Sequence, residues 1–288
     1  IKFEKEAEEG KYQYMVTDYP GTIGLRFNFI NGGTSGLMSN VKIRKAISYS
    51  IDREEMIDAV YGRYNPAYSY VAPAITFNGS SYRSQVGEVI EDEYNEYVGD
   101  PDKIVALFQE GLDELGVETP IEDITLTYLT SGSTTEVQAE REYIQQSLEE
   151  TLGLTVELSV AGDNSLFIAD RNEGNYDFFL GGWYSDYNDP LDFLYTNYTD
   201  AYGMSFGGYS NTDYDALADQ LVGETDMDKR LDIYKQMEQI LLLDDCAFAP
   251  IYYATKQVLL QNWVKDYRTS SFGASAEFIW TYIDGKNQ

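Results

Sequence analysis

Apolar and polar residues alternate in several parts of the chain, and this alternation predicts β-strands. Ile23, Leu25, Phe27 and Phe29 occupy every second position, a period that places them on one face of a strand. The same period recurs further along, and the predicted strands are 22–30, 124–128, 154–160, 176–183, 248–254 and 257–260.

Between these strands, apolar residues recur three and four positions apart, which predicts helices. Asp100 and Pro101 form a cap followed by a proline in the first turn, and Gly116 marks the end of the same helix. Ser133 and Glu136 form a capping box at the start of another helix. The predicted helices are 41–61, 101–116, 134–152, 164–172, 190–198, 212–222 and 226–243.

The order of these elements predicts the fold class. The strand at 124–128, the helix after it and the strand at 154–160 form a βαβ unit, which makes the two strands parallel with a right-handed crossover. The strand at 176–183 extends the same sheet. We therefore expect an α/β fold with a mixed, largely parallel sheet flanked by helices. Residues 63–100 form a long irregular segment, which we expect to be functional or mobile.

The charge and composition exclude several functions. Lys and Arg number 20 against 49 Asp and Glu, so the net charge of the 288 residues is −29. Such a surface repels phosphate, which argues against nucleic acid and anionic lipid as partners. The chain has no histidine, and its one cysteine, Cys246, is expected to be a small buried apolar residue. Because the chain starts with Ile1 and has no apolar run of membrane-spanning length, we interpret it as processed or truncated.

Candidate binding chemistry gathers after the strand at 176–183. The sequence GGWYSDYNDP (181–190) brings aromatic and acidic residues to the end of that strand. Ligands of open α/β sheets bind beyond the carboxyl ends of strands, and a carboxylate among aromatic rings suits an ammonium group. A second segment at 202–211 is likewise rich in glycine and aromatic residues. The candidate ligand-binding residues are Gly182, Trp183, Tyr184, Asp186, Tyr187, Phe206 and Tyr209.

Two other kinds of site are conceivable for the same segment. Asp186 and Asp189 could form the carboxylate pair of a glycoside hydrolase, but such pairs arise readily in so acidic a chain. The segment does not match a calcium-binding loop, and the simplest role for Asp189 is to cap the following helix. The sequence therefore predicts a binding protein without catalytic residues, metal ligands or cofactor.

Two longer motifs carry a resemblance to a known family. These are NVKIRKAISYSIDREEMI (40–57) and YDFFLGGWYSDYNDPLDFL (176–194). Together with 207–217 and 229–253, they resemble the peptide-binding family of extracellular solute-binding proteins, the oligopeptide and dipeptide receptors of ABC importers. The resemblance covers about residue 20 to the end of the chain.

The resemblance implies the second lobe of a two-lobed clamshell, with the ligand held between the lobes. It implies a connector from a missing first lobe at 1–21, a C-terminal ligand-binding lobe at 22–261, and a tail at 262–288 that packs toward the first lobe. Asp186 would hold the α-amino group of a peptide, and Trp183 would stand beside the cleft.

The resemblance also implies a role for the whole protein. It would be the substrate-binding component of an ABC importer, a monomer that captures peptides and delivers them to the permease subunits. It would act in the periplasm, or on the extracellular face of the cytoplasmic membrane through a lipid anchor on the missing N-terminal part. An oligosaccharide or a nickel complex is the alternative cargo for the same fold.

Overall fold

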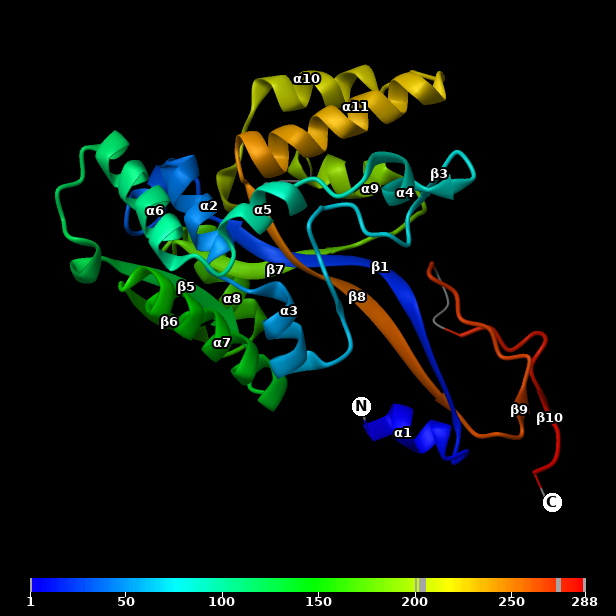
Figure 1. Ribbon diagram of the computed structural model, residues 1–288. Helices are drawn as coiled ribbons and strands as arrows, with labels where there is room; N and C mark the ends of the chain where they lie inside the picture. Colours follow the sequence, from blue (N-terminus) through cyan, green and yellow to red (C-terminus); the bar gives the residue numbers. More distant parts are fainter. Residues whose placement is uncertain (1, 200, 202–205, 273–275, 287–288) are drawn as a thin grey trace.

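A mixed sheet with helices on both faces forms the body of the protein (Figure 1). The computed structural model describes residues 2–199, 201, 206–272 and 276–286. The strands of the main sheet are β1 (Gln13–Phe27), β2 (Asn65–Pro66), β5 (Thr125–Ser131), β6 (Thr155–Ala161), β7 (Phe178–Tyr184) and β8 (Phe248–Leu260). Two small hairpins are β3 (Thr76–Phe77) with β4 (Ser80–Ser81), and β9 (Val264–Lys265) with β10 (Tyr282–Ile283).

The order of strands in the main sheet is β2-β8-β1-β7-β5-β6. β1 pairs antiparallel with both β7 and β8, whereas β5 pairs parallel with both β6 and β7. The predicted α/β class, the mixed sheet and the βαβ unit are confirmed. The sheet is less parallel than expected, because the pairings of β1 with β7, β1 with β8 and β2 with β8 are antiparallel.

The helices form layers above and below this sheet. In the view of Figure 1, α9 to α11 lie above the sheet. α7 and α8 pack on β5 and β6 from opposite faces, because α7 contacts the face that carries Tyr128 and Phe178, whereas Phe167 of α8 contacts Leu129 and Phe179 on the other face. The helices are α1 (Lys2–Glu8), α2 (Val41–Tyr49), α3 (Arg53–Met56), α4 (Tyr82–Val86), α5 (Glu91–Tyr97), α6 (Pro101–Leu115), α7 (Thr135–Leu152), α8 (Asn164–Glu173), α9 (Pro190–Leu194), α10 (Thr212–Gln220) and α11 (Met227–Gln239). Among the described residues, no helix has the length and apolar character that a membrane span needs.

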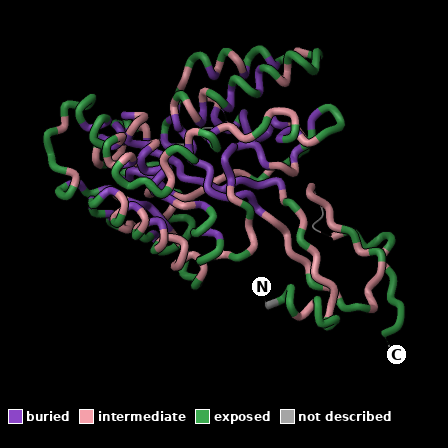
Figure 2. The backbone as a smooth tube through the Cα atoms, in the orientation of Figure 1, coloured by how far each residue is buried: buried purple, intermediate pink, exposed green. Residues whose placement is uncertain are grey.

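β1 and β8 continue beyond the body as a two-stranded arm. Their ladder runs from Gln13 opposite Leu260 to Arg26 opposite Phe248, and α1 and the β9/β10 hairpin lie at its far end (Figure 1). The half of the ribbon inside the body is buried, and the outer half is largely half-buried or exposed (Figure 2). We define this outer half, with α1 and the hairpin, as the arm.

The arm differs from the sequence expectation at its boundaries. β1 starts at Gln13, so the expected boundary between connector and lobe at residue 22 falls inside a strand. The two strands expected at 248–254 and 257–260 are one continuous strand, β8. The outer residues of this ribbon are not packed against a core, so they lack the apolar alternation that marks a half-buried strand.

The helix expected at 41–61 is interrupted. α2 ends at Tyr49, and α3 starts at Arg53 because the side chain of Asp52 accepts a hydrogen bond from the Glu55 amide and caps a new helix. Ile57–Tyr61 then form a π-helical turn. The periodicity of the apolar residues survives these breaks, which is why the segment looks like one helix in the sequence.

Two buried arginines of this region connect distant segments through backbone carbonyls. The Arg44 guanidinium donates to the carbonyl oxygens of Met38 and Asp245, at 2.5 Å each. Arg53 donates to the carbonyls of Ala67 at 3.1 Å and Pro250 at 2.8 Å. These arginines belong to the motif at 40–57, and their contacts give that motif a structural role.

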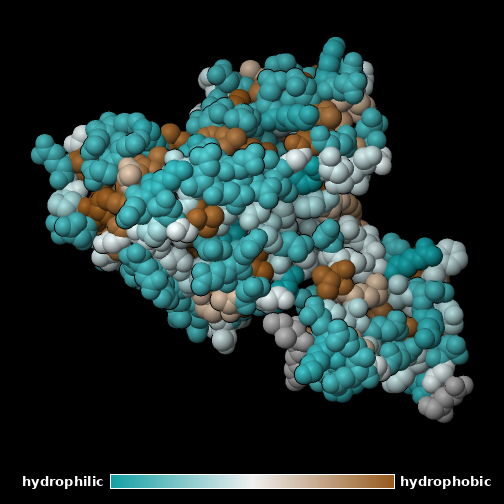
Figure 3. All heavy atoms as spheres, viewed as in Figure 1, coloured by the Kyte–Doolittle hydropathy of each residue, from teal (hydrophilic) through white to brown (hydrophobic). Residues whose placement is uncertain are grey.

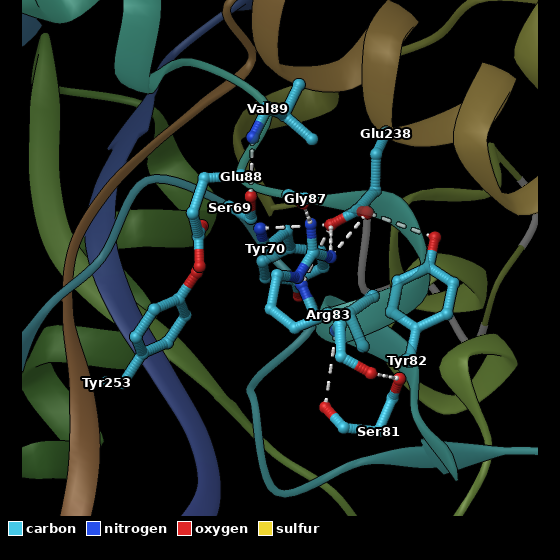
Figure 4. A network of polar contacts seen from close by, with 12 residues as sticks. Ser69, Tyr70, Ser81, Tyr82, Arg83, Gly87, Glu88, Val89, Glu238 and Tyr253 are labelled. Atoms are coloured by element: carbon cyan, nitrogen blue, oxygen red, sulfur yellow. Dashed lines mark hydrogen bonds and ion pairs between the residues drawn. The ribbon is translucent and has the colours of Figure 1, made fainter.

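The segment at 63–100, which the sequence predicts to be irregular, contains the short helices α4 and α5 and is anchored to α11 by one buried carboxylate. Glu238 accepts hydrogen bonds from the Arg83 guanidinium, the Tyr82 hydroxyl and the amides of Tyr70 and Val71 (Figure 4). Much of the segment is buried, and it contributes to the core. Packing and hydrogen bonds therefore hold the segment in position, and these contacts do not support the expectation of a mobile loop.

Several local predictions are confirmed. Asp100 caps α6, with Pro101 in the first turn and Gly116 at its C-terminal cap. Cys246 is buried, and burial raises the pKa of its thiol to about 11. The cap of α7 is Thr134 and not Ser133, because the Thr134 hydroxyl accepts from the Val137 amide.

Candidate functional site

The end of β7 presents an open strand edge. On one side, β7 pairs with β1 along its whole length, up to Tyr184 opposite Gly21. On the other side, its ladder with β5 includes only Phe178 and Phe179. Among the described residues, positions 181–184 therefore have no ladder partner on the β5 side, and their backbone groups on that side are available to another extended chain.

The turn after β7 is held by a carboxylate from α9. Asp192 accepts hydrogen bonds from the Trp183 indole nitrogen at 2.8 Å and from the Asp186 amide at 2.9 Å. The Ser185 amide donates to the Pro20 carbonyl at 2.8 Å, which ties the same turn to β1. Asp192 is buried, so these two donors are the means by which its charge is stabilised.

An acidic, aromatic cavity of about 180 Å³ opens beside this turn. It is lined by Trp183, Asp186, Tyr187, Asp192, Tyr195, Thr196 and Ala201. Asp186 is exposed at the cavity, and no hydrogen bond joins its carboxylate to another side chain or amide in the described part of the chain. The cavity therefore presents a negative charge among aromatic rings, which suits an ammonium group.

The structure brings some of the expected residues together. Trp183, Asp186 and Tyr187 all line the acidic cavity. Gly182 lies next to them in β7 but faces β1, because a Cβ there would be 1.9 Å from the Thr22 carbonyl oxygen. Its role is close strand packing.

The other expected residues lie elsewhere. Tyr184 follows Trp183 in the strand and points to the opposite face of the sheet, where it packs against Tyr19. Tyr209 is buried, and its hydroxyl donates to Asp245 at 2.6 Å, so this residue belongs to the core and not to the cavity. The side chain of Phe206 lies outside the described part of the structure.

The sequence missed Asp192, Tyr195 and Thr196 as cavity residues. They belong to α9 and the 3₁₀ turn after it, and they reach the cavity because Pro190 starts α9 directly after the turn. The available signal was the spacing of Asp192 three residues after Asp189, which places it one helical turn beyond the cap.

Asp189 has structural partners of its own, which are separate from Asp186. Asp189 caps α9 by accepting from the Leu191 amide, and it also accepts from the Tyr234 hydroxyl at 2.8 Å. The predicted cap is confirmed. Within the described residues, no group of three or more acidic or cysteine side chains is placed to hold a metal ion.

A second, larger pocket of about 450 Å³ lies on the face of the sheet to which Tyr184 points. It is lined by Tyr19, Tyr64, Tyr184, Ala254, Thr255 and Lys256. We refer to it as the tyrosine pocket. The end of β7 thus separates two pockets of different size and chemistry.

A mixed sheet with pockets beyond the end of one strand is the arrangement of an α/β ligand-binding domain. Residues 2–205 match the family model described as bacterial extracellular solute-binding proteins, family 5, middle part. The chain therefore belongs to the family 5 bacterial extracellular solute-binding proteins.

Relatives of known role have similar sequences. The chain is 30% identical over 249 residues to the dipeptide-binding protein DppE of Bacillus subtilis, covering 86% of this chain and 42% of the relative. It is 31% identical over 237 residues to the oligopeptide-binding protein OppA of the same organism, covering 80% of this chain and 39% of the relative. The chain thus spans less than half the length of these relatives.

Solved structures share the fold. Listeria monocytogenes OppA bound to peptide has a TM-score of 0.76 and 29% identity, covering 98% of this chain and 52% of that one. The substrate-binding domain of an oligopeptide ABC transporter from Bacillus anthracis has a TM-score of 0.80 and 24% identity, over 98% of this chain and 53% of that one.

Proposed function

We propose that this chain is the C-terminal half of a peptide receptor that serves an ABC importer and has no catalytic role. The observation that carries the proposal is the open edge of β7, with the carboxylate of Asp186 just beyond it. An extended peptide can add to such an edge through backbone hydrogen bonds, which give affinity without reading side chains. The names of the relatives, which bind dipeptides and oligopeptides, support this cargo.

Asp186 is the residue that would anchor the peptide. Its carboxylate lies at the acidic cavity, close to the indole of Trp183 and to Tyr187. An α-amino group placed there would form a charge-assisted hydrogen bond with Asp186 and would lie against aromatic rings. Asp192 adds a second negative charge to the cavity wall.

The remaining parts of the proposal concern the whole protein. The first lobe would close over the ligand, and the tail at 262–288 would pack toward that lobe. The receptor would be a monomer that works outside the cytoplasmic membrane, lipid-anchored or periplasmic, and passes its cargo to the permease. The family description as extracellular solute-binding proteins supports this location.

The test is calorimetry of the full-length receptor, with both lobes present, against a pool of tri- to hexapeptides. We expect the pool to bind, and we expect binding to be lost with Asp186→Asn and with N-acetylated peptides. Asp213→Asn, at an exposed position on α10, is the matched control and should bind as the wild type does. If oligosaccharides or nickel complexes bind while the peptides do not, the proposal of a peptide cargo is wrong.

A further inference from the structure

The walls of the tyrosine pocket are held in fixed positions. The ring of Tyr64 stacks on that of Tyr252, with centroids 4.5 Å apart and planes inclined by 2°. The Tyr64 hydroxyl accepts from Arg63 at 2.9 Å. Tyr252 also contacts Tyr61, with ring centroids 4.9 Å apart. Because its neighbours already fix the Tyr64 ring, little side-chain freedom remains to be lost when a ligand binds.

A second wall is formed across two strands. The Tyr184 ring lies over Gly21, its register partner on β1, where a Cβ would be 2.3 Å from Tyr184 Cδ1. Tyr19 and Tyr184 contact each other with ring centroids 5.7 Å apart and planes inclined by 54°. Tyr184 nevertheless remains 48% exposed, so much of its ring is available to a ligand.

Small residues create the space between these walls. Ala254 lies at the floor, and a Cβ at Gly21 would be 3.3 Å from the Cβ of Ala254. The Thr255 hydroxyl donates to the Arg63 carbonyl. The part of the pocket between the rings is therefore mainly aromatic and aliphatic.

The position of the pocket relates it to the peptide. This step rests on the proposed function: the side chains of a peptide lying along the edge of β7 alternate between the two faces of the sheet. Trp183 lines the acidic cavity on one face, and Tyr184 lines the tyrosine pocket on the other. The tyrosine pocket lies over β1 and β8, on the side of β7 away from the open edge, so a peptide side chain would reach it beyond the end of β7, past the ring of Tyr184. The tyrosine pocket is the larger, at about 450 Å³ against about 180 Å³.

We propose that the tyrosine pocket takes an aromatic side chain of the bound peptide and thereby sets a preference for Phe, Tyr or Trp at one peptide position. Aromatic rings gain from tilted and offset contacts with other rings beyond the area that they bury. Tyr19, Tyr64 and Tyr184 offer such contacts from separate strands and loops, and an aliphatic side chain would make fewer of them.

The test uses the full-length receptor and calorimetry with tetra-alanine, four peptides in which one Phe is moved through the sequence, and the four matching Leu peptides. We expect one position at which Phe binds at least about tenfold more tightly than Ala and measurably more tightly than Leu. Equal affinities for Phe and Leu at every position would overturn the proposal.

Two variants assign the preference to the pocket. Ala254→Leu fills the floor and should bring the ratio of Phe to Ala affinities close to one, whereas Ala169→Leu, at an exposed position on α8, should leave the ratio unchanged. Tyr184→Leu removes a half-exposed ring and should remove the preference for Phe over Leu. This second variant tests the proposal independently of Ala254, which is buried and whose replacement by Leu can prevent folding. Thermal unfolding reports whether each variant folds.

The outcomes separate the two proposals. If no peptide binds to the folded full-length receptor, the proposed function fails, and this inference fails with it. If peptides bind but the Phe preference is absent, or survives both variants, the receptor function stands and the role of the tyrosine pocket is wrong.

Discussion

Asp192 shows how one buried residue can organise the wall of a cavity. Its carboxylate accepts hydrogen bonds from the indole of Trp183 and the amide of Asp186, so it fixes both the aromatic wall of the acidic cavity and the turn that carries the Asp186 carboxylate. Its negative charge also forms part of the cavity wall. Geometry and charge can be separated because asparagine keeps an acceptor oxygen but removes the charge.

We expect Asp192→Ala to lower the free energy of unfolding by about 1–3 kcal/mol, because it leaves two donors without their acceptor. Peptide affinity of the full-length receptor should fall as well. Asp192→Asn should be the milder change in urea unfolding. If Ala and Asn at this position have equal stability, the two hydrogen bonds do not hold the turn.

Glu238 has the same organising role for the segment at 63–100. Its side chain is fully buried and lies against Arg83, which is 6% exposed. Removing one member of a buried ion pair leaves the other charge uncompensated, so we expect Glu238→Gln to lower the free energy of unfolding by about 3–5 kcal/mol. Asp232→Asn, at an exposed position on the same helix, should change it by less than about 0.5 kcal/mol. Denaturant unfolding of both variants checks the prediction, and equal stabilities would contradict it.

Glu140 on α7 predicts a dependence of stability on pH. Burial raises the pKa of its carboxyl to about 7 from an ordinary value of 4.5, and Tyr61 donates a hydrogen bond to it. The folded chain then retains a proton that the unfolded chain releases above about pH 4.5. Stability should therefore fall between about pH 4.5 and 7, by at most about 3 kcal/mol for this group.

Repulsion among the carboxylates of a chain with net charge −29 also lowers stability as the pH rises, so a variant is needed to isolate the contribution of Glu140. Glu140→Gln keeps the shape of the side chain but removes its titration. The slope of unfolding free energy against pH should be shallower in this variant over that window. Parallel curves for the two proteins would show that Glu140 does not titrate there.

At the scale of elements, glycine at two positions allows close packing. Gly111 lies where α6 contacts α2, and a Cβ there would be 2.6 Å from Ile43 Cγ1. Gly182 lies where β7 contacts β1, and the corresponding distance to the Thr22 carbonyl oxygen is 1.9 Å. A glycine within a helix or strand usually lowers stability, and at these two positions the close contact between elements explains why glycine is present.

We expect Gly182→Ala to lower the free energy of unfolding by about 1–3 kcal/mol, because the strands must separate to admit a methyl group. The shift would also move the open edge of β7, so peptide affinity should fall. Gly162→Ala is the matched control, since its nearest neighbour would be Leu166 Cδ1 at 3.4 Å, an ordinary contact. If the two variants unfold alike, the close approach at Gly182 is not rigid.

The sequence could predict features that depend on neighbours along the chain. The caps at Asp100 and Asp189, the βαβ unit and the cluster at the end of β7 all follow from local spacing. The tyrosine pocket could not be predicted, because Tyr19, Tyr64 and Ala254 come from distant parts of the chain and meet only when β1 and β8 pair. The sequence wrongly assigns Tyr209 to the site for the opposite reason. Its aromatic surroundings in the sequence resemble those of the site, whereas its burial is a tertiary effect.

At the scale of the whole molecule, the body and the C-terminal tail have different surfaces. On the face shown in Figure 3, hydrophilic residues cover most of the body, in keeping with the net charge. Near the chain's end, Phe278, Ile279 and Trp280 are 66%, 82% and 60% exposed. Consecutive exposed apolar residues of this kind mark a surface that another part of a protein covers. This supports the proposal that the tail packs toward a first lobe.

We therefore expect Trp280 to be quenched by acrylamide in the 288-residue chain and shielded from it in the full-length receptor. Trp280→Phe, made in both proteins, isolates the signal of this residue from those of the other tryptophans. Equal quenching of Trp280 in the two proteins would mean that the first lobe does not cover the tail.

The ladder between β1 and β8 has one further consequence. Its register shifts between Asp18 and Thr22, where Pro20 and Gly21 lie, and again between Ile23 and Gly24. A two-stranded ribbon is most compliant where rungs are missing, so bending of the arm should concentrate there. This irregularity interrupts the hydrogen bonding of a continuous two-stranded ribbon and is not a flexible linker. Because both strands continue through this point, they should limit the amplitude and direction of any bending of the arm. The same irregularity borders the tyrosine pocket, which contains Tyr19 and Ala254.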